Sequence, residues 1–328
     1  MKKLLFSILA ILILFVSGYF WWNTSVKPLN KSEGEVNFLI LKGASATQIA
    51  NKLQNEDIIR SSLAFKFYVQ LTGRAKKIKS GEYQISPAMS MFEIVSDLLK
   101  GPKALWVTIP EGLRREEIAE KFIQGLSKSE SDGNIFRDEF LQLSNGEEGY
   151  LFPDTYLLPK TITASKVFNL MKSTFNGKTA DISFSKHSLN EVVIVASLLE
   201  RETITDAEKP IVAGIIYKRL ENDWPLQIDA TIQYALASKN CGSSSVNCDW
   251  WKKSLTRDDI AINSSYNTYK LQGLPPAPIS NPGLSSLEAA ASPEGSLFWF
   301  YIHDSKGTIH YGKTIEEHNK NISKYLGK

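Results

Sequence analysis

The chain has 328 residues, enough for two domains, and its 43% hydrophobic and 22% charged residues are typical of a globular protein. Its 38 basic and 35 acidic residues give a formal charge of +3 and are scattered, which excludes the strongly basic footprint of nucleic-acid-binding proteins. The two cysteines and four histidines form no metal-ligand motif, so we predict no metal site.

The first 25 residues predict a membrane anchor. Residues 4–22 carry no charge, follow Lys2 and Lys3, and end in four consecutive aromatic residues. As a helix they would span about 28 Å, close to the hydrocarbon thickness of a bilayer, and Tyr and Trp favour its interface. A cleaved signal peptide is the alternative, but bulky side chains stand where the peptidase requires small ones. We therefore expect an uncleaved helix at 1–25, with its N-terminus in the cytoplasm and the rest of the chain outside, in the periplasm or its equivalent.

After a polar linker at 26–35, the segment 36–102 predicts a compact unit of short strands and helices. The strands are expected at 36–42 and 81–86, and helices of two to three turns begin near Ser45, Ser62 and Ser90. Short strands and helices alternate in this segment, and we expect a small α+β module.

The same pattern recurs farther along the chain. Gly43 aligns with Gly112 at an offset of 69 residues, and neighbouring apolar positions align at the same offset. These matches predict a second related module at 103–186. Its extra length, at about 124–148, predicts an insertion with an exposed polar loop at 128–134.

The remaining part of the chain, 187–328, predicts an α+β domain organised around one buried helix. Ser188 and Glu191 form the reciprocal capping pattern that begins a helix, and the run VVIVASLLERET follows. Apolar residues occupy nearly all its faces, so the helix should be buried all round. Glu200 and Glu202, at its end, are about 200° apart and therefore point to opposite sides.

A carboxyl group at the edge of such a core is a candidate general acid, because burial disfavours its charged form. Acidic side chains are also unfavourable at a helix C-terminus, where the helix dipole favours cations. The alternative is that Glu200, Arg201 and Glu202 are only the exposed end of a core helix, which is the commoner position of charged residues.

Further helices and one hairpin complete the predicted domain. Helices are expected to begin at Asp206, Asp229, Thr256, Ser285 and Thr314, and a hairpin joins strands at 297–303 and 308–312. Cys241 and Cys248 bracket a turn-rich stretch, which predicts a local disulfide in an oxidising compartment, with two reduced thiols as the alternative.

A long irregular segment, 265–283, predicts a wall of a binding site. Loops of this length in compact domains are usually functional or disordered, and its four prolines favour order. Its Tyr and Asn residues suit a sugar site, because rings stack on pyranose faces and amides bind hydroxyl groups. The segment 148–156 offers similar chemistry. The alternative for both segments is that their aromatic residues belong to the core.

Several of these segments resemble, in the same order, the signature segments of one family. They are EGYLFPDTY at 148–156, ASLLERET at 196–203, LQIDATIQY at 226–234, the loop 265–283, SLEAA at 286–290 and HN at 318–319. They are similar to those of the endolytic murein transglycosylases, the MltG or YceG-like proteins, over nearly all of the chain. The resemblance implies an inner-membrane enzyme with a LysM-like module. Such an enzyme cleaves nascent peptidoglycan between N-acetylmuramic acid and N-acetylglucosamine and leaves 1,6-anhydro-N-acetylmuramic acid ends.

The resemblance also implies a catalytic glutamate in the E-x-E-T segment, which falls on Glu202, with Glu200 as the fallback. One carboxyl suffices if the 6-hydroxyl of muramic acid attacks, because Glu202 would protonate the leaving oxygen and then accept the hydroxyl proton. The candidate sugar-binding residues are Gln227, Asp229, Tyr266, Asn267 and Tyr269. No cofactor is implied.

Two other functions are open at this point. A membrane-anchored scaffold would bind peptidoglycan through LysM-like modules without cleaving it. A hydrolase would use Glu202 and Asp229 as an acid and base pair and would give reducing ends. The expected partners are peptidoglycan glycan strands and the membrane, with peptidoglycan synthases as further candidates.

Overall fold

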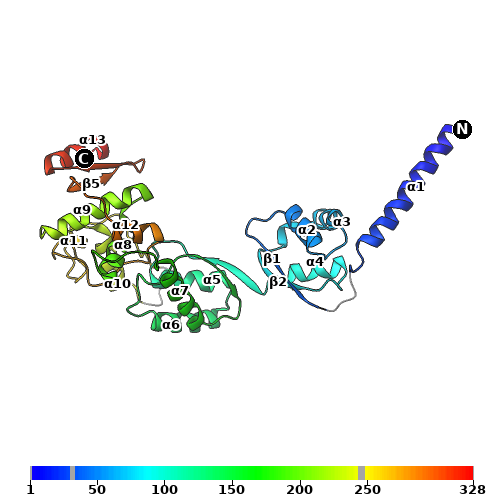
Figure 1. The fold of residues 1–328 in the computed structure, drawn as a ribbon, viewed down its shortest axis with the longest axis horizontal. Coiled ribbons are helices and arrows are strands. Elements are labelled where there is room, and N and C mark those ends of the chain that lie inside the picture. Colours follow the sequence, from blue (N-terminus) through cyan, green and yellow to red (C-terminus); the bar gives the residue numbers. More distant parts are fainter. Residues whose placement is uncertain (1, 30–33, 243–247, 328) are drawn as a thin grey trace. The chain divides into compact units, whose positions relative to one another are not determined.

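The computed structural model describes residues 2–29, 34–242 and 248–327 and divides into two compact units. Unit 1 comprises Met1–Val107 and Tyr156–Thr161, and unit 2 comprises Thr108–Thr155 and Ile162–Lys328. Both units contain helices and strands, which confirms the predicted α+β class (Figure 1). The five-part division expected from the sequence stays a prediction, because compactness alone does not identify modules.

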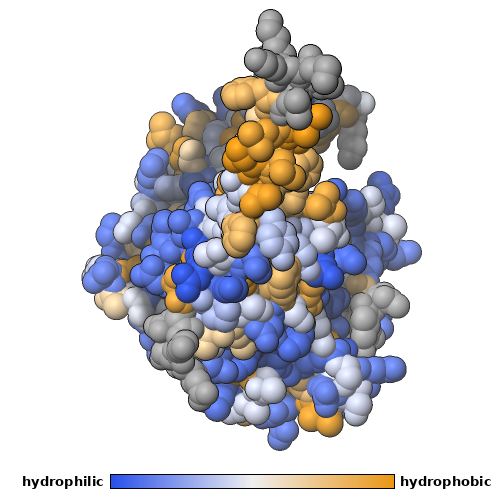
Figure 2. All heavy atoms as spheres, turned by 90° about the vertical axis from the view of Figure 1, so that its right-hand side faces the viewer, coloured by the Kyte–Doolittle hydropathy of each residue, from blue (hydrophilic) through white to orange (hydrophobic). Residues whose placement is uncertain are grey.

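Helix α1 (Lys2–Ser25) belongs to unit 1. Its segment Phe6–Ser25 is apolar over 20 residues and is exposed except at its end, where Trp22 and Ser25 contact the rest of unit 1, so it is long and apolar enough to cross a membrane. Figure 2 shows it as an apolar column that projects from a largely hydrophilic surface.

The next elements of unit 1 follow the predicted order. They are β1 (Val36–Ile40), α2 (Ala46–Asn55), α3 (Ser62–Leu71), the 3-10 turn η1 (Ala75–Lys77), β2 (Gly81–Ile85) and α4 (Met91–Lys100). The predicted capping boxes at Ser45 and Ser90 are present. β1 pairs antiparallel with β2, and β3 (Ala104–Thr108) and β4 (Thr155–Pro159) complete a sheet of order β1-β2-β3-β4. Phe38 and Ile85 share an apolar core with α2, α3 and α4.

The order strand, helix, helix, strand, helix occurs a second time, as β3, α5 (Arg115–Gly125), α6 (Glu130–Leu143), β4 and α7 (Ala164–Lys178). The prediction of a loop at 128–134 is wrong for residues 130–134, because Ser129 caps α6 and the helix begins at Glu130. A glycine inside this helix disfavours the helical state, but here it permits close packing. A Cβ atom at Gly133 would lie 2.9 Å from Ile123 Cγ2 of α5.

The core of unit 2 is built on α8 (Leu189–Glu202), which packs against α9 (Lys209–Glu221) and α12 (Leu284–Ala291). Every residue of α8 from Val192 to Leu199 is buried, as predicted. The other elements are the 3-10 turn η2 (Asp206–Glu208), α10 (Asp229–Asn240), α11 (Arg257–Ile260), the antiparallel hairpin of β5 (Phe300–His303) and β6 (Ile309–Gly312), and α13 (Ile315–Leu326). Cys241 and Cys248 form a disulfide, with Cα atoms 5.9 Å apart.

Of the helix starts predicted in unit 2, the Ser188 cap of α8 and two later caps are confirmed, and three residues expected to cap a helix do not do so. Thr256 and Thr314 cap their helices. The residues that precede η2, α10 and α12 are instead Thr205, Ile228 and Gly283. Ser285 is not available as a cap because its hydroxyl group bonds to Asp206 Oδ1 at 2.8 Å and to Lys209 Nζ at 2.7 Å.

Candidate active site

Helix α8 holds Glu202 at a fixed position. At its start, the Ser188 hydroxyl accepts from Glu191 N, and the Glu191 carboxylate accepts from Ser188 N. Its apolar faces are buried, and each buried Val or Leu side chain contributes about 1.5–3 kcal/mol to such packing. At its end, Thr203 N donates to Leu199 O at 3.0 Å and closes the last turn. The carboxyl group is therefore presented by the core of unit 2.

Glu202 lines a pocket of about 560 Å³ in unit 2, a size in the usual range of ligand sites. The walls come from the ends of α8 and α9, the start of α10, the irregular loop, β5 and α13. The lining residues are Arg201, Glu202, Arg219, Leu226, Gln227, Asp229, Tyr269, Phe300, Tyr301, Ile302, His303, Ile315 and His318. Segments far apart in the sequence thus converge on one carboxyl group.

The surroundings of the Glu202 carboxyl favour its protonated form. Burial raises the pKa of Glu202, and the nearby Asp229 carboxylate raises it further. Tyr301 Oη donates a hydrogen bond to Glu202 Oε2 at 2.8 Å, and this bond and the nearby His303 lower the pKa in part. The net shift is upward, so Glu202 keeps a proton at higher pH than an ordinary glutamate.

Asp229 and Tyr269 form a hydrogen-bonded pair in the same pocket. Tyr269 Oη donates to Asp229 Oδ1 at 2.5 Å. Asp229 lies in the first turn of α10, where the helix dipole favours an acidic side chain. Burial raises the pKa of Tyr269, so its phenol group stays protonated at neutral pH. The pair presents both a carboxylate and a ring to the pocket.

Arg219 fixes two walls of the pocket. Its buried guanidinium group donates to Trp299 O at 2.6 and 2.9 Å and to Leu226 O at 2.6 Å. Gln227, which follows Leu226, has a φ of 54°, and its N–H donates to Thr268 O at 3.0 Å. A non-glycine residue in this left-handed region is uncommon, and such residues cluster at functional sites.

Glu200 lies in a different environment from Glu202, as their angular offset predicts. Its Oε2 accepts from Gly283 N at 3.1 Å and from Ser286 Oγ at 2.6 Å, and Lys209 Nζ is 3.8 Å away. Glu200 is not among the residues that line the Glu202 pocket. Its contacts instead tie the start of α12 to α8.

Three of the five predicted sugar-binding residues line the pocket, namely Gln227, Asp229 and Tyr269. Tyr266 is not among the lining residues, and its ring packs against Tyr234 with the centroids 4.7 Å apart. Both rings are partly buried against the core of unit 2, which is the alternative position for aromatic residues of this loop.

Asn267 also lies outside the pocket lining and is only 1% exposed. Its Nδ2 donates to Ile260 O at 2.9 Å and to Ile262 O at 2.7 Å. Its Oδ1 accepts from Tyr269 N at 3.0 Å. Asn267 therefore holds the backbone of a residue that does line the pocket.

Arg219, Tyr301 and His303 also line the pocket and were not predicted from the sequence. Tyr301 and His303 alternate with apolar residues on β5, and this period of two was the signal that could have placed them on one face of the strand. Arg219 gave no comparable signal, because a basic residue in the last turn of a helix is usually exposed.

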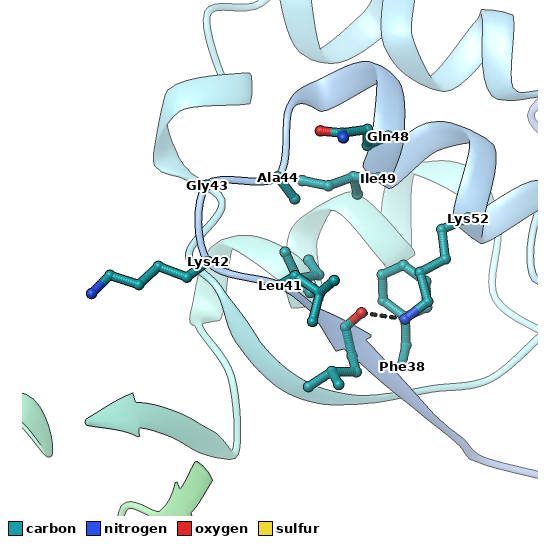
Figure 3. Close-up of a pocket in the computed structure, with 10 residues that line it drawn as sticks. Phe38, Leu41, Lys42, Gly43, Ala44, Gln48, Ile49 and Lys52 are labelled. Carbon is teal, nitrogen blue, oxygen red and sulfur yellow. Dashed lines mark hydrogen bonds between the residues drawn. The ribbon is translucent and has the colours of Figure 1, made fainter. Parts of the chain in front are cut away.

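A smaller pocket of about 210 Å³ lies in unit 1, beside β1 and the start of α2 (Figure 3). Lys52 Nζ donates to Leu39 O at 2.5 Å, and the Lys42 side chain points away from the pocket. No acidic side chain occurs among the described residues that line it, so it offers no general acid.

Comparisons with known proteins identify the class to which this fold and site belong. The chain belongs to the YceG-like family, whose family model matches residues 38–324, and this confirms the resemblance. It is 32% identical over 343 residues to the endolytic murein transglycosylase of Bacillus subtilis, and this alignment covers 95% of this chain and 91% of that protein. It is 27% identical over 359 residues to the endolytic murein transglycosylase of Streptococcus pneumoniae, with 96% of this chain and 63% of that protein covered. A crystal structure of a YceG-like protein from Listeria monocytogenes aligns with a TM-score of 0.54 at 29% identity and covers 88% of this chain and 99% of that one.

Proposed function

We propose that this protein is a lytic transglycosylase that cleaves the glycan strands of peptidoglycan. The observation that carries the proposal is the Glu202 carboxyl, which lines the large pocket of unit 2 and whose pKa is raised. The family and the printed names of the relatives from Bacillus subtilis and Streptococcus pneumoniae support peptidoglycan as the substrate.

In the proposed reaction Glu202 acts first as an acid and then as a base. Its proton goes to the glycosidic oxygen between N-acetylmuramic acid and N-acetylglucosamine as the bond from C1 to that oxygen breaks. The 6-hydroxyl of the muramic acid residue attacks C1, and its proton returns to the Glu202 carboxylate. The products are a 1,6-anhydro-N-acetylmuramic acid end and a free N-acetylglucosamine hydroxyl. Because the attack is intramolecular, its high effective molarity replaces the activation that a second carboxylate gives in glycoside hydrolases.

Tyr301 is the positioning residue in this proposal. Its hydroxyl donates to Glu202 Oε2 and, together with the hydrogen bond from the Ala230 backbone, holds the carboxyl group in place at the pocket. Burial raises the pKa of Tyr301 well above its usual range, so the phenol group remains a donor throughout the cycle. When Glu202 becomes a carboxylate, the same bond stabilises its charge.

Gln227, Asp229 and Tyr269 are the proposed sugar contacts. The Asp229 carboxylate and the Gln227 amide can bind sugar hydroxyl and acetamido groups, and the Tyr269 ring can stack on a pyranose face. For Tyr266 and Asn267 we propose a supporting role, because one packs on the core and the other binds the backbone beneath Tyr269.

Helix α1 is proposed to be a single-pass anchor in the plasma membrane, with both units outside the cytoplasm. Its apolar length and the resemblance to inner-membrane enzymes support this location. The elements from β1 to α4 are proposed to be a LysM-like module that retains glycan. Nascent strands would then come from peptidoglycan synthases in the same membrane.

The test is mass spectrometry of the soluble products released from un-crosslinked glycan by the full chain in detergent. We expect fragments with 1,6-anhydro ends from the parent protein and none from Glu202→Gln. Glu200→Gln is the matched control, since it makes the same chemical change two residues earlier and should leave the anhydro products in place.

Each other outcome identifies a different function. Reducing ends would indicate a hydrolase that uses Glu202 and Asp229. Glycan that is retained but unchanged would indicate a binding scaffold. Anhydro products that persist in Glu202→Gln and vanish in Glu200→Gln would move the acid to Glu200.

A further inference from the structure

Helix α3 carries an apolar stripe that the rest of unit 1 leaves uncovered. Leu63, Phe67 and Leu71 are 65%, 54% and 74% exposed. Their spacing of four residues places them on one face of the helix, while its buried residues face the core. Single exposed apolar residues are common, but an aligned stripe of large ones marks an interaction surface.

The stripe is continuous with the C-terminal end of α1. The Trp22 ring lies 5.9 Å from the Phe67 ring and 6.4 Å from the Phe92 ring, measured between centroids. Met91 N donates to Val26 O at 3.0 Å, so the backbone after α1 is fixed to the same unit. In an anchored helix the aromatic end lies at the membrane interface. Phe67 therefore lies at the depth of that interface.

Basic residues are concentrated in the sequence around the stripe. The segment 58–81 contains six basic residues and no acidic one, and the basic residues are Arg60, Lys66, Arg74, Lys76, Lys77 and Lys79. Arg60 donates to Pro28 O at 2.9 Å and Leu29 O at 3.2 Å, which holds the linker that leaves α1. An apolar helix face bordered by Lys and Arg is typical of segments that lie on anionic membranes.

We propose that the α3 stripe binds the outer surface of the membrane, with Leu63, Phe67 and Leu71 in the interfacial layer and the basic residues at anionic lipid headgroups. The proposal rests on the proposed anchor α1, which brings Phe67 to the interface. A single anchor leaves a unit free to tilt, and a second apolar contact beside it would hold unit 1 against the bilayer.

The test uses the full chain in vesicles of phosphatidylglycerol and phosphatidylcholine that contain nitroxide-bearing lipids. An environment-sensitive fluorophore is attached to Leu63→Cys or Leu71→Cys. Leu41→Cys is the matched control, because Leu41 is 60% exposed on the same unit but lies on the loop after β1. Leu14→Cys, within α1, reports on the anchor itself. Cys241 and Cys248 form a disulfide and do not take the label.

We expect labels at 63 and 71 to be quenched by the nitroxide lipids several-fold more than the label at 41, and less in vesicles without phosphatidylglycerol. Equal quenching at 63, 71 and 41, with a quenched label at 14, would overturn the proposal and leave the anchor intact. No quenching at 14 would mean that the anchor is wrong, and no quenching at any position would overturn both. Quenching that depends on protein density and not on nitroxide would assign the stripe to a second copy of the chain and overturn the lipid contact.

Discussion

Glu148 and Glu202 are both glutamates of unit 2 with raised pKa values, and the surroundings of their carboxyl groups differ. Glu148 is 6% exposed, and burial, with a further contribution from Glu116, raises its pKa to about 8. Its Oε1 accepts from Arg115 N at 3.0 Å and Asn281 Nδ2 at 2.6 Å, and Oε2 has no hydrogen-bond partner among the residues that the structure describes. Glu202 has a pKa shifted in the same direction, but it lines a pocket of about 560 Å³.

The difference shows that a raised pKa identifies a buried charge and not a catalytic one. Glu148 belongs to a structural joint, because Asn281 Oδ1 also accepts from Gly149 N at 2.9 Å and Leu151 N at 3.0 Å. A general acid additionally needs space for the substrate beside its proton. Of these two carboxyls, only Glu202 lines the pocket, so the proposed chemistry falls on Glu202 and a structural role on Glu148.

The largest expected effect is that of Glu202→Gln on catalysis. We expect kcat/KM for glycan cleavage to fall by about 10²–10⁴-fold, as the loss of a general acid does. The melting temperature should stay the same or rise, because a neutral amide replaces a carboxyl group that is costly to ionise there. Reaction rates and thermal unfolding of the same preparation measure both. A large loss of stability would break the comparison, since the Glu202 carboxyl would then be needed to hold the fold together.

The second prediction concerns stability and Glu148→Gln. Glu148 keeps its proton up to a pKa of about 8 in the folded protein, whereas in the unfolded chain its pKa is 4.5. Between these values the unfolded state binds fewer protons, so the free energy of unfolding falls as pH rises. The variant keeps an oxygen acceptor and cannot ionise. The free energy of unfolding of the variant should therefore not fall with pH in this range. Above about pH 8 it should exceed that of the parent by on the order of 2–4 kcal/mol.

Denaturant unfolding of both proteins between pH 5 and pH 9, in steps of about one unit, measures the slope that linkage predicts. Glycan cleavage by Glu148→Gln at neutral pH should match that of the parent. Parallel stability curves for the two proteins would show that Glu148 ionises normally in the folded state and would remove the basis of the comparison.

A smaller effect is expected for Tyr301→Phe, which removes a hydrogen bond that lowers the pKa of Glu202. Without it the pKa of Glu202 rises further. Because the proposed reaction begins with protonated Glu202, activity should be lost as pH rises through this pKa, so the alkaline limb of the pH profile should move to higher pH. We expect kcat to fall about fivefold, since the loss of one hydrogen bond costs on the order of 1 kcal/mol.

Tyr217→Phe is the control for this variant. Tyr217 is a buried tyrosine that donates to Ala290 O at 3.0 Å and does not line the pocket. Its replacement should cost stability and leave the pH profile unchanged. An unchanged alkaline limb in Tyr301→Phe as well would mean that Tyr301 does not position the acid.

The helices that hold the site were largely predictable from the sequence, because their signals are local. The Ser188 capping box and the apolar run that follows specify α8 and deliver Glu202 at its end. The error at α6 arises from tertiary packing, since Gly133 disfavours a helix in isolation and is accommodated here by its close contact with Ile123 of α5. The helix propensities of the residues in 128–134 take no account of that contact.

The composition of the pocket was predictable only in part. Gln227 and Asp229 lie near the start of one helix, but Tyr301 binds Glu202 across 99 positions of sequence. Which side chains of two distant segments meet is decided by packing, and residue type does not reveal it. Asn267 illustrates the same limit, since an amide suited to a sugar is used to hold two carbonyl groups of its own chain.

The smallest effect on catalysis is expected for Glu200→Gln, two residues from Glu202. Glu200 accepts from Gly283 N and Ser286 Oγ and faces Lys209, whose side chain is 6% exposed. Loss of the Glu200 charge leaves Lys209 paired with Asp206, whose Oδ1 is 2.9 Å from Lys209 Nζ. The free energy of unfolding should therefore fall by about 1–3 kcal/mol. Activity per folded molecule should stay within about twofold of the parent, because no contact to the reacting sugar is removed. Kinetics corrected for the folded fraction from urea unfolding measure this, and a loss as large as that of Glu202→Gln in a folded protein would transfer the role of the acid to Glu200.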